Sequence, residues 1–220
     1  MIDPDGIDVP ELLGRWYGPP SAPEWTVPAE ASWLPAPLRE WYGLESRWTR
    51  LQSGGTRVYR PAQVRADGGE AVFMEDPTGD WTWSFDVGQP DRVHEGEPGG
   101  DRSPVPEALP EFLVHLALAQ LVVTADFGRL CAQLPADLLP GVLTSLEEVG
   151  FAGWRWPRPG HRIFLGDSAI ANVGPAIDPR APWRNREGHV AVRIAGIGPS
   201  DLDHLDAVPS VKWIDFGFGT

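Results

Sequence analysis

Glycine and proline interrupt this chain so often that its helices and strands must be short. The 220 residues include 25 glycines and 24 prolines, which cluster between runs that have strand character. Both residue types mark turns and end regular segments. The runs at 56–59, 70–74 and 81–86, divided by glycine-containing turns, predict an antiparallel meander. This pattern argues against a helical bundle, and we expect an α+β fold.

Alternating side chains define the last of these strands, in the stretch DPTGDWTWSFD at residues 76–86. Successive side chains of a strand point to opposite faces, so three aromatic residues share one face and three polar residues share the other. The aromatic face predicts packing on the core, and the polar face predicts exposure to solvent. The aromatic residues are Trp81, Trp83 and Phe85, and the polar residues are Thr82, Ser84 and Asp86.

Apolar residues that recur every three or four positions predict helices elsewhere in the chain. The expected helices are a short one around residues 12–16 and others at 34–42, 105–125, 136–149 and 200–208. Further strands are expected at 163–165, 169–173, 189–195 and 211–216, with polar loops at 92–104 and 174–188. This order predicts one domain at 1–130 and a C-terminal helix-and-sheet extension at 131–220, with one continuous sheet as the alternative.

Negative charge is concentrated in one short part of the sequence. The formal net charge is −13, and residues 66–111 contribute 12 acidic and 2 basic side chains to it. Such a field repels nucleic acids and anionic membranes and attracts basic proteins or cations. A solvated acidic loop that only keeps the protein soluble is the simpler interpretation, so a functional one needs separate support.

Cysteine and histidine usage gives no sign of a disulfide, a metal site or a cofactor. Cys131 is the single cysteine, and the N-terminal stretch lacks the basic and apolar regions of a signal peptide, so we expect a cytoplasmic protein. The longest apolar run, at 112–123, is too short for a membrane span. The five histidines show no HxxxH pairing, and no nucleotide-binding glycine motif is present.

One pair of segments suggests a hydrolase. Ser168 follows the expected strand at 163–165, and Asp201 and His204 form a DxxH pattern. Together they resemble the first and last blocks of the SGNH hydrolases, which implies a nucleophile, an orienting acid and a base. The two blocks lie too close in the sequence to bracket the parallel sheet of that family. A helix N-terminus capped by Ser200 explains the second block equally well.

The order of the N-terminal elements resembles the SUKH superfamily. The helix LPAPLREWYGL, the strands AVFMEDPTG and DWTWSFD, and the helix SPVPEALPEFLVHLALAQ occur in the family's order. The similarity covers residues 10–126 and implies a mostly antiparallel sheet packed against helices. The family often has glutamine-glycine in the turn that is Asp76-Pro77-Thr78-Gly79 here, so no role of a single residue is carried over.

The resemblance implies a function in protein binding rather than catalysis. Bacterial members are mostly immunity proteins against polymorphic toxins, whereas fungal relatives act as scaffolds. A non-enzymatic module that binds and occludes a basic toxin domain is therefore the leading hypothesis, and a housekeeping adaptor is the alternative. Oligomeric state is left open. The candidate partner-binding residues are Asp76, Asp80, Asp86, Asp91, Glu95 and Glu97.

Overall fold

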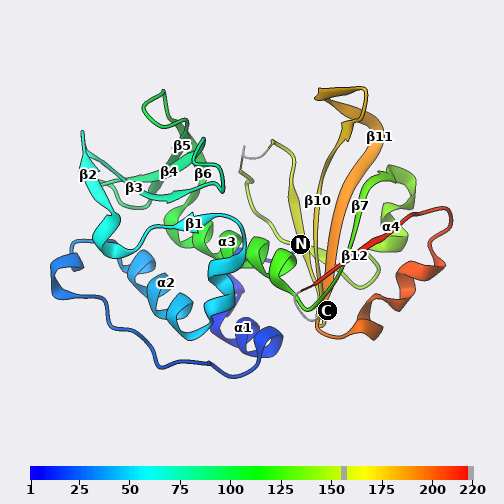
Figure 1. The fold of residues 1–220 in the computed structure, drawn as a ribbon, viewed down its shortest axis with the longest axis horizontal. Coiled ribbons are helices and arrows are strands. Elements are labelled where there is room, and N and C mark those ends of the chain that lie inside the picture. The colour runs from blue at the N-terminus through cyan, green and yellow to red at the C-terminus, as the bar shows by residue number, and fades with distance from the viewer. Residues whose placement is uncertain (155–157, 218–220) are drawn as a thin grey trace. The chain divides into compact units, whose positions relative to one another are not determined.

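The computed structural model describes residues 1–154 and 158–217, which form two compact units (Figure 1). The N-terminal unit is Ile7–Gln120, and the C-terminal unit combines Met1–Gly6 with Leu121–Thr220. The strands form two separate antiparallel sheets of six strands each, so the expected α+β class is confirmed. The domain boundary near residue 130 stays a prediction, because compactness alone does not show that a segment folds independently.

The N-terminal unit contains three α-helices and one meander. Its strands follow the order β1-β3-β4-β5-β6, and β2 pairs with β3. The helices are α1 (Val9–Tyr17), α2 (Ala36–Arg47) and α3 (Leu109–Thr124), whose last turn belongs to the C-terminal unit. The strands are β1 (Arg57–Val58), β2 (Arg65–Asp67), β3 (Glu70–Glu75), β4 (Thr82–Asp86), β5 (Arg92–Gly96) and β6 (Ser103–Ala108).

Aromatic rings join α3 to one face of this sheet. Phe73 of β3 meets Phe112 of α3 edge-on at a centroid distance of 5.7 Å, and Trp83 of β4 lies 6.4 Å from the same ring. Phe85 packs beside Phe73 at 6.1 Å. Trp83 and Phe85 are buried, which confirms the core face predicted from the alternation, whereas Trp81 is half-buried at the strand's start.

The prediction of a polar loop at 92–104 is wrong, because these residues form β5, a turn and the start of β6. Two prolines, Pro104 and Pro106, interrupt the strand pattern of β6, so the sequence does not predict this strand. β6 lies at the edge of the sheet, and both prolines are exposed there. Edge strands tolerate proline because one side needs no ladder hydrogen bond. The long helix accordingly starts at Leu109 rather than near residue 105.

The C-terminal unit is built around a sheet with the strand order β12-β7-β11-β10-β9-β8. Its strands are β7 (Phe127–Pro135), β8 (Glu147–Glu148), β9 (Arg162–Leu165), β10 (Ala169–Asp178), β11 (Ala181–Gly196) and β12 (Ile214–Phe216). Its core includes Cys131, Val192 and Leu205, all buried. No helix among the described residues is long and apolar enough to cross a membrane.

Two expectations for this unit are wrong. The helix expected at 136–149 is reduced to a 3-10 turn and the single turn α4 (Leu139–Val142), because Pro140 and Gly141 interrupt the apolar pattern. The loop expected at 174–188 is instead the outer part of a long β10–β11 hairpin. The segment expected as a helix at 200–208 is a 3-10 helix, Pro199–Ala207, and its Leu202 and Leu205 are buried.

Candidate functional site

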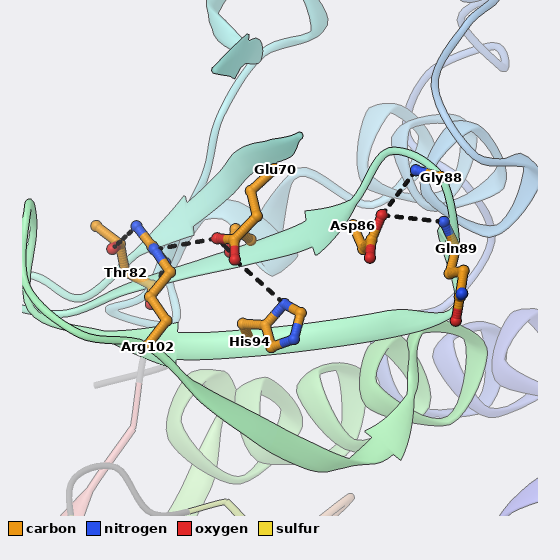
Figure 2. A network of polar contacts seen from close by, with 8 residues as sticks. Glu70, Thr82, Asp86, Gly88, Gln89, His94 and Arg102 are labelled. Atoms are coloured by element: carbon orange, nitrogen blue, oxygen red, sulfur yellow. Dashed lines mark hydrogen bonds and ion pairs between the residues drawn. The ribbon is translucent and has the colours of Figure 1, made fainter. Parts of the chain in front are cut away.

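The sheet face opposite α3 carries a polar network centred on Glu70 (Figure 2). The Ser84 hydroxyl donates to Glu70 Oε2 at 2.8 Å, and Arg102 Nε lies 3.3 Å from the same oxygen. His94 Nδ1 lies 3.7 Å from Glu70 Oε1. Arg102 also donates to Thr82 Oγ1 at 2.9 Å, so one guanidinium links the ends of β3 and β4.

This network corrects the expectation that the polar face of β4 is open to solvent. Thr82 and Ser84 are 5% and 0% exposed, because the longer side chains around them cover the strand. Ser84 is the cross-strand neighbour of His94, yet its hydroxyl donates to Glu70 rather than to the imidazole. A serine nucleophile requires a hydrogen-bonded base, so this arrangement braces the sheet instead of activating Ser84.

Two acidic turns lie side by side at one end of the sheet. One connects β3 to β4 with the sequence DPTGD at 76–80, and the other connects β5 to β6 with EPGGD at 97–101. Thr82, just after the first turn, is the cross-strand partner of Gly96, just before the second turn, so the two turns are neighbours at this end of the sheet. Each turn is closed by a backbone bond between its first and fourth residues, at 3.1 and 3.0 Å, and proline follows the first residue, where such turns favour it.

These turns expose three carboxylates, which we call the acidic end: Asp80, Glu97 and Asp101. The ion pairs of the described part of the chain include none of these three side chains. The nearest basic residue in the sequence, Arg102, directs its guanidinium to Glu70. The negative charge of the acidic end is therefore available to a partner.

Asp76 is buried and holds the first acidic turn in shape. Its carboxylate accepts a hydrogen bond from the Thr78 hydroxyl at 2.7 Å and another from the Trp81 backbone N–H at 2.9 Å. Burial by itself would raise the pKa of Asp76, but these and other backbone hydrogen bonds favour the charged form and lower the pKa below its ordinary value. Asp76 supports the acidic end rather than contacting a partner directly.

We expect Asp76→Ala to lower the free energy of unfolding by about 2–3 kcal/mol at neutral pH, because hydrogen bonds to a charged acceptor are lost. Urea denaturation followed by tryptophan fluorescence measures this loss. Since the folded-state pKa is lowered, the contribution of Asp76 is present at neutral pH and disappears as the pH falls through that pKa. Asp80→Ala, on an exposed neighbour, is the control and should change stability by under about 0.5 kcal/mol. Equal losses in the two variants would contradict the role given to Asp76.

Asp86, the last residue of β4, and Asp91, the residue before β5, lie at the opposite end of the sheet. Asp86 Oδ1 accepts from the backbone N–H groups of Gly88 and Gln89 at 2.7 and 3.1 Å, so it caps this turn. Asp91 is exposed, but the exposed Arg92 follows it directly. This end has mixed charge and presents no continuous acidic surface.

Glu95 is inside the protein, at 1% exposure, because it shares the core face of β5 with Val93. The Trp83 indole N–H donates to its carboxylate at 3.1 Å. The structure thus brings together two predicted residues, Asp80 and Glu97, with Asp76 beneath them. Sequence reasoning missed Asp101, although the repeated pattern of acid, proline, any residue, glycine and aspartate in both turns was visible.

The three residues of the hydrolase hypothesis do not form a triad. The Ser168 hydroxyl donates to Asp201 at 2.9 Å, while His204 Nε2 lies 3.1 Å from the Val142 carbonyl oxygen. Asp201 also accepts from the Gly198 backbone N–H at 2.7 Å, so it caps the 3-10 helix in place of the expected Ser200. These contacts match a structural role for the DxxH segment.

Comparisons with protein-family models, curated proteins and solved structures find no match for this chain. The SUKH resemblance therefore rests on the residues and their order alone. Within the described residues, no group of three or more histidine, cysteine, aspartate or glutamate side chains is placed to hold a metal ion.

Proposed function

We propose that this chain is a SUKH-like immunity module whose acidic end binds a basic toxin domain and occludes it. The observation that carries the proposal is the pairing of two acidic turns, which places Asp80, Glu97 and Asp101 at one end of the sheet. The exposed Arg57, on the neighbouring strand β1, is paired with Glu75 rather than with these carboxylates. The neutralising action is binding itself, so no catalytic group is needed on this chain.

The charge distribution favours fast association with a basic partner. Residues 66–111 contain only two bases: Arg102 pairs with Glu70, and Arg92 lies at the far end of the sheet. A predominantly acidic surface of this kind steers an oppositely charged protein and accelerates association by about 10- to 1,000-fold. It also orients the partner, since like charges on a wrong partner are repelled.

Backbone hydrogen bonds close both acidic turns, and the Asp76 carboxylate holds the first of them in shape. Gly79 and Gly99 have φ values of 77° and 73°, which other residues rarely adopt, so each glycine suits its turn. Gly96 has no room for a side chain, because a Cβ atom would approach the Asp101 backbone oxygen to 2.6 Å. Preorganised loops lose less conformational freedom on binding, which raises affinity.

Affinity capture with a charge-reversed variant tests this proposal. The wild-type chain should retain a basic protein from a lysate of its own host at low salt, and the variant should lose it. Coexpression of the wild-type chain with that protein should protect cells, whereas an adaptor would capture a partner without toxicity. The reversed variant is Asp80→Lys, Glu97→Lys and Asp101→Lys, and the control is Glu40→Lys, Asp67→Lys and Asp91→Lys, three exposed acids elsewhere in the same unit.

Capture that is equally strong with both variants would show that net charge or another surface governs binding. The control has the same total charge as the reversed variant, so only the location of the carboxylates differs. A captured partner that is not toxic would instead favour the adaptor function.

A further inference from the structure

The β10–β11 hairpin extends beyond the sheet of the C-terminal unit (Figure 1). The pairing of β9 with β10 ends at Val173, and the pairing of β7 with β11 ends at His189. Residues 177–188, which we call the arm, follow as a two-stranded ribbon, with Ile177 paired to Asn185 and irregular register around it. A ribbon of two strands buries little apolar surface and has two open edges.

The arm presents a tryptophan among arginines. Trp183 is 77% exposed, and Ile177 at the base of the arm is 44% exposed. The arm contains three arginines, Arg180, Arg184 and Arg186, and both of its acids, Asp178 and Glu187, lie outside the stretch RAPWRNR at 180–186 around the tryptophan. Tryptophan and arginine are the residues most enriched at the energetic centres of protein interfaces. The arm therefore has the composition of a docking element for a negatively charged surface.

Side chains at the base of the arm hold it in one conformation. Gln133 Nε2 donates to the Ile177 carbonyl oxygen at 2.6 Å, and Arg186 donates to Gln133 Oε1 at 2.5 Å. Arg158, which lies outside the hairpin, donates to two residues of β11, to Asn185 Oδ1 at 3.3 Å and to the Pro182 carbonyl oxygen. These bonds position Trp183 before any partner arrives, so little ordering remains to be done on binding.

We propose that the arm docks on the acidic end of a second copy of this chain. The complementary surface is present in the same sequence: Asp80, Glu97 and Asp101 are exposed carboxylates without an ion pair among the described residues, and guanidinium groups bind carboxylates in a two-pronged geometry. Each acidic turn also exposes a proline ring, Pro77 or Pro98, against which an indole can pack.

We expect two copies to make these contacts reciprocally. In a two-fold dimer each chain would contribute one arm and one acidic end, and closed pairs of this kind are the commonest homo-oligomers. A nucleic acid is the poorer occupant for the arm, since the whole chain carries a net charge of −13.

Sedimentation velocity of the full chain, over a broad concentration range at low and moderate salt, tests the proposal. We expect a monomer–dimer equilibrium that weakens as salt increases. Trp183→Ala should raise the dimer dissociation constant at least about tenfold. Trp25→Ala, at a tryptophan that is 43% exposed in the N-terminal unit, is the matched control and should leave the constant unchanged.

Mixing two charge-reversed chains tests whether the arm meets the acidic end. One variant is Arg180→Glu with Arg184→Glu, and the other is Asp80→Lys, Glu97→Lys and Asp101→Lys. Each alone should be monomeric, because its arm and its acidic end carry like charge. An equimolar mixture should form heterodimers, since each reversed surface then meets an opposite charge.

A wild-type chain that stays monomeric at every concentration would overturn the proposal, as would an unchanged dimer in Trp183→Ala. Reversed chains that remain monomeric when mixed would show that the acidic end is not the receptor. None of these results affects the toxin-binding proposal, which requires only the acidic end and a basic partner. A positive result predicts that dimerisation and toxin binding compete.

Discussion

Replacing His115 with leucine is expected to lower the free energy of unfolding by about 3–5 kcal/mol, because a buried, hydrogen-bonded ionisable pair is broken. His115 Nδ1 on α3 lies 2.9 and 3.1 Å from the two carboxylate oxygens of Glu107 on β6. The side chains are 5% and 0% exposed, so the carboxylate cannot turn to water when the imidazole is removed. Urea denaturation followed by tryptophan fluorescence gives the loss directly.

The double variant Glu107→Leu with His115→Leu separates the hydrogen bond between these two side chains from simple packing. Because it removes both polar groups, its loss should be clearly smaller than the sum of the two single losses, by at least about 1 kcal/mol. Additive losses would mean that the two side chains do not stabilise each other. A loss below about 1 kcal/mol for His115→Leu alone would contradict the structural role of the pair.

Glu45→Gln is expected to raise stability at alkaline pH by about 2–3 kcal/mol and to leave it unchanged near pH 4. Burial raises the pKa of Glu45 on α2 from 4.5 to about 7, although the charge of Arg60 lowers it in part. The folded protein therefore keeps a proton that the unfolded chain releases, and wild-type stability falls as the pH rises from about 4.5 to about 7. Glutamine resembles the protonated side chain at every pH, so it avoids this loss.

Denaturation curves at about pH 4, 6 and 8 measure the difference between this variant and the wild type. The matched control is Glu40→Gln on the same helix, where the carboxylate is exposed, and it should change stability by under about 0.5 kcal/mol. A constant difference between Glu45→Gln and the wild type across this range would show that burial does not hold the proton on Glu45.

The meander of the N-terminal unit was predictable because its signals are local. Glycine turns and alternation located β3 and β4, and the buried Trp83 and Phe85 confirm the face assigned to them. β5 and β6 were missed because they carry polar residues and prolines. Glu95 and Glu107 lie on the core face of these strands, where Trp83 and His115 provide hydrogen bonds from other elements. Such partners depend on the tertiary fold, which residue patterns alone do not give.

The candidate site was predictable in part. The sequence shows that the negative charge is concentrated at 66–111. It does not show which acidic residues lie at which end of the sheet, because that depends on how the strands pair. Alternation along β5 would have placed Glu95 on the same face as Val93 and so removed it from the surface set. The arm was expected to be a loop because Pro175 and Pro182 interrupt its strand pattern, and the register shift near Pro175 accommodates the first of them.

The most direct test of the proposed function is the association rate between this chain and its captured basic partner, measured at low and moderate salt. With the variant Asp80→Lys, Glu97→Lys and Asp101→Lys, the rate at low salt should fall at least about tenfold relative to the control Glu40→Lys, Asp67→Lys and Asp91→Lys. The difference between the two variants should narrow as salt screens the charges. Equal rates for the two variants at low salt would contradict binding through the acidic end.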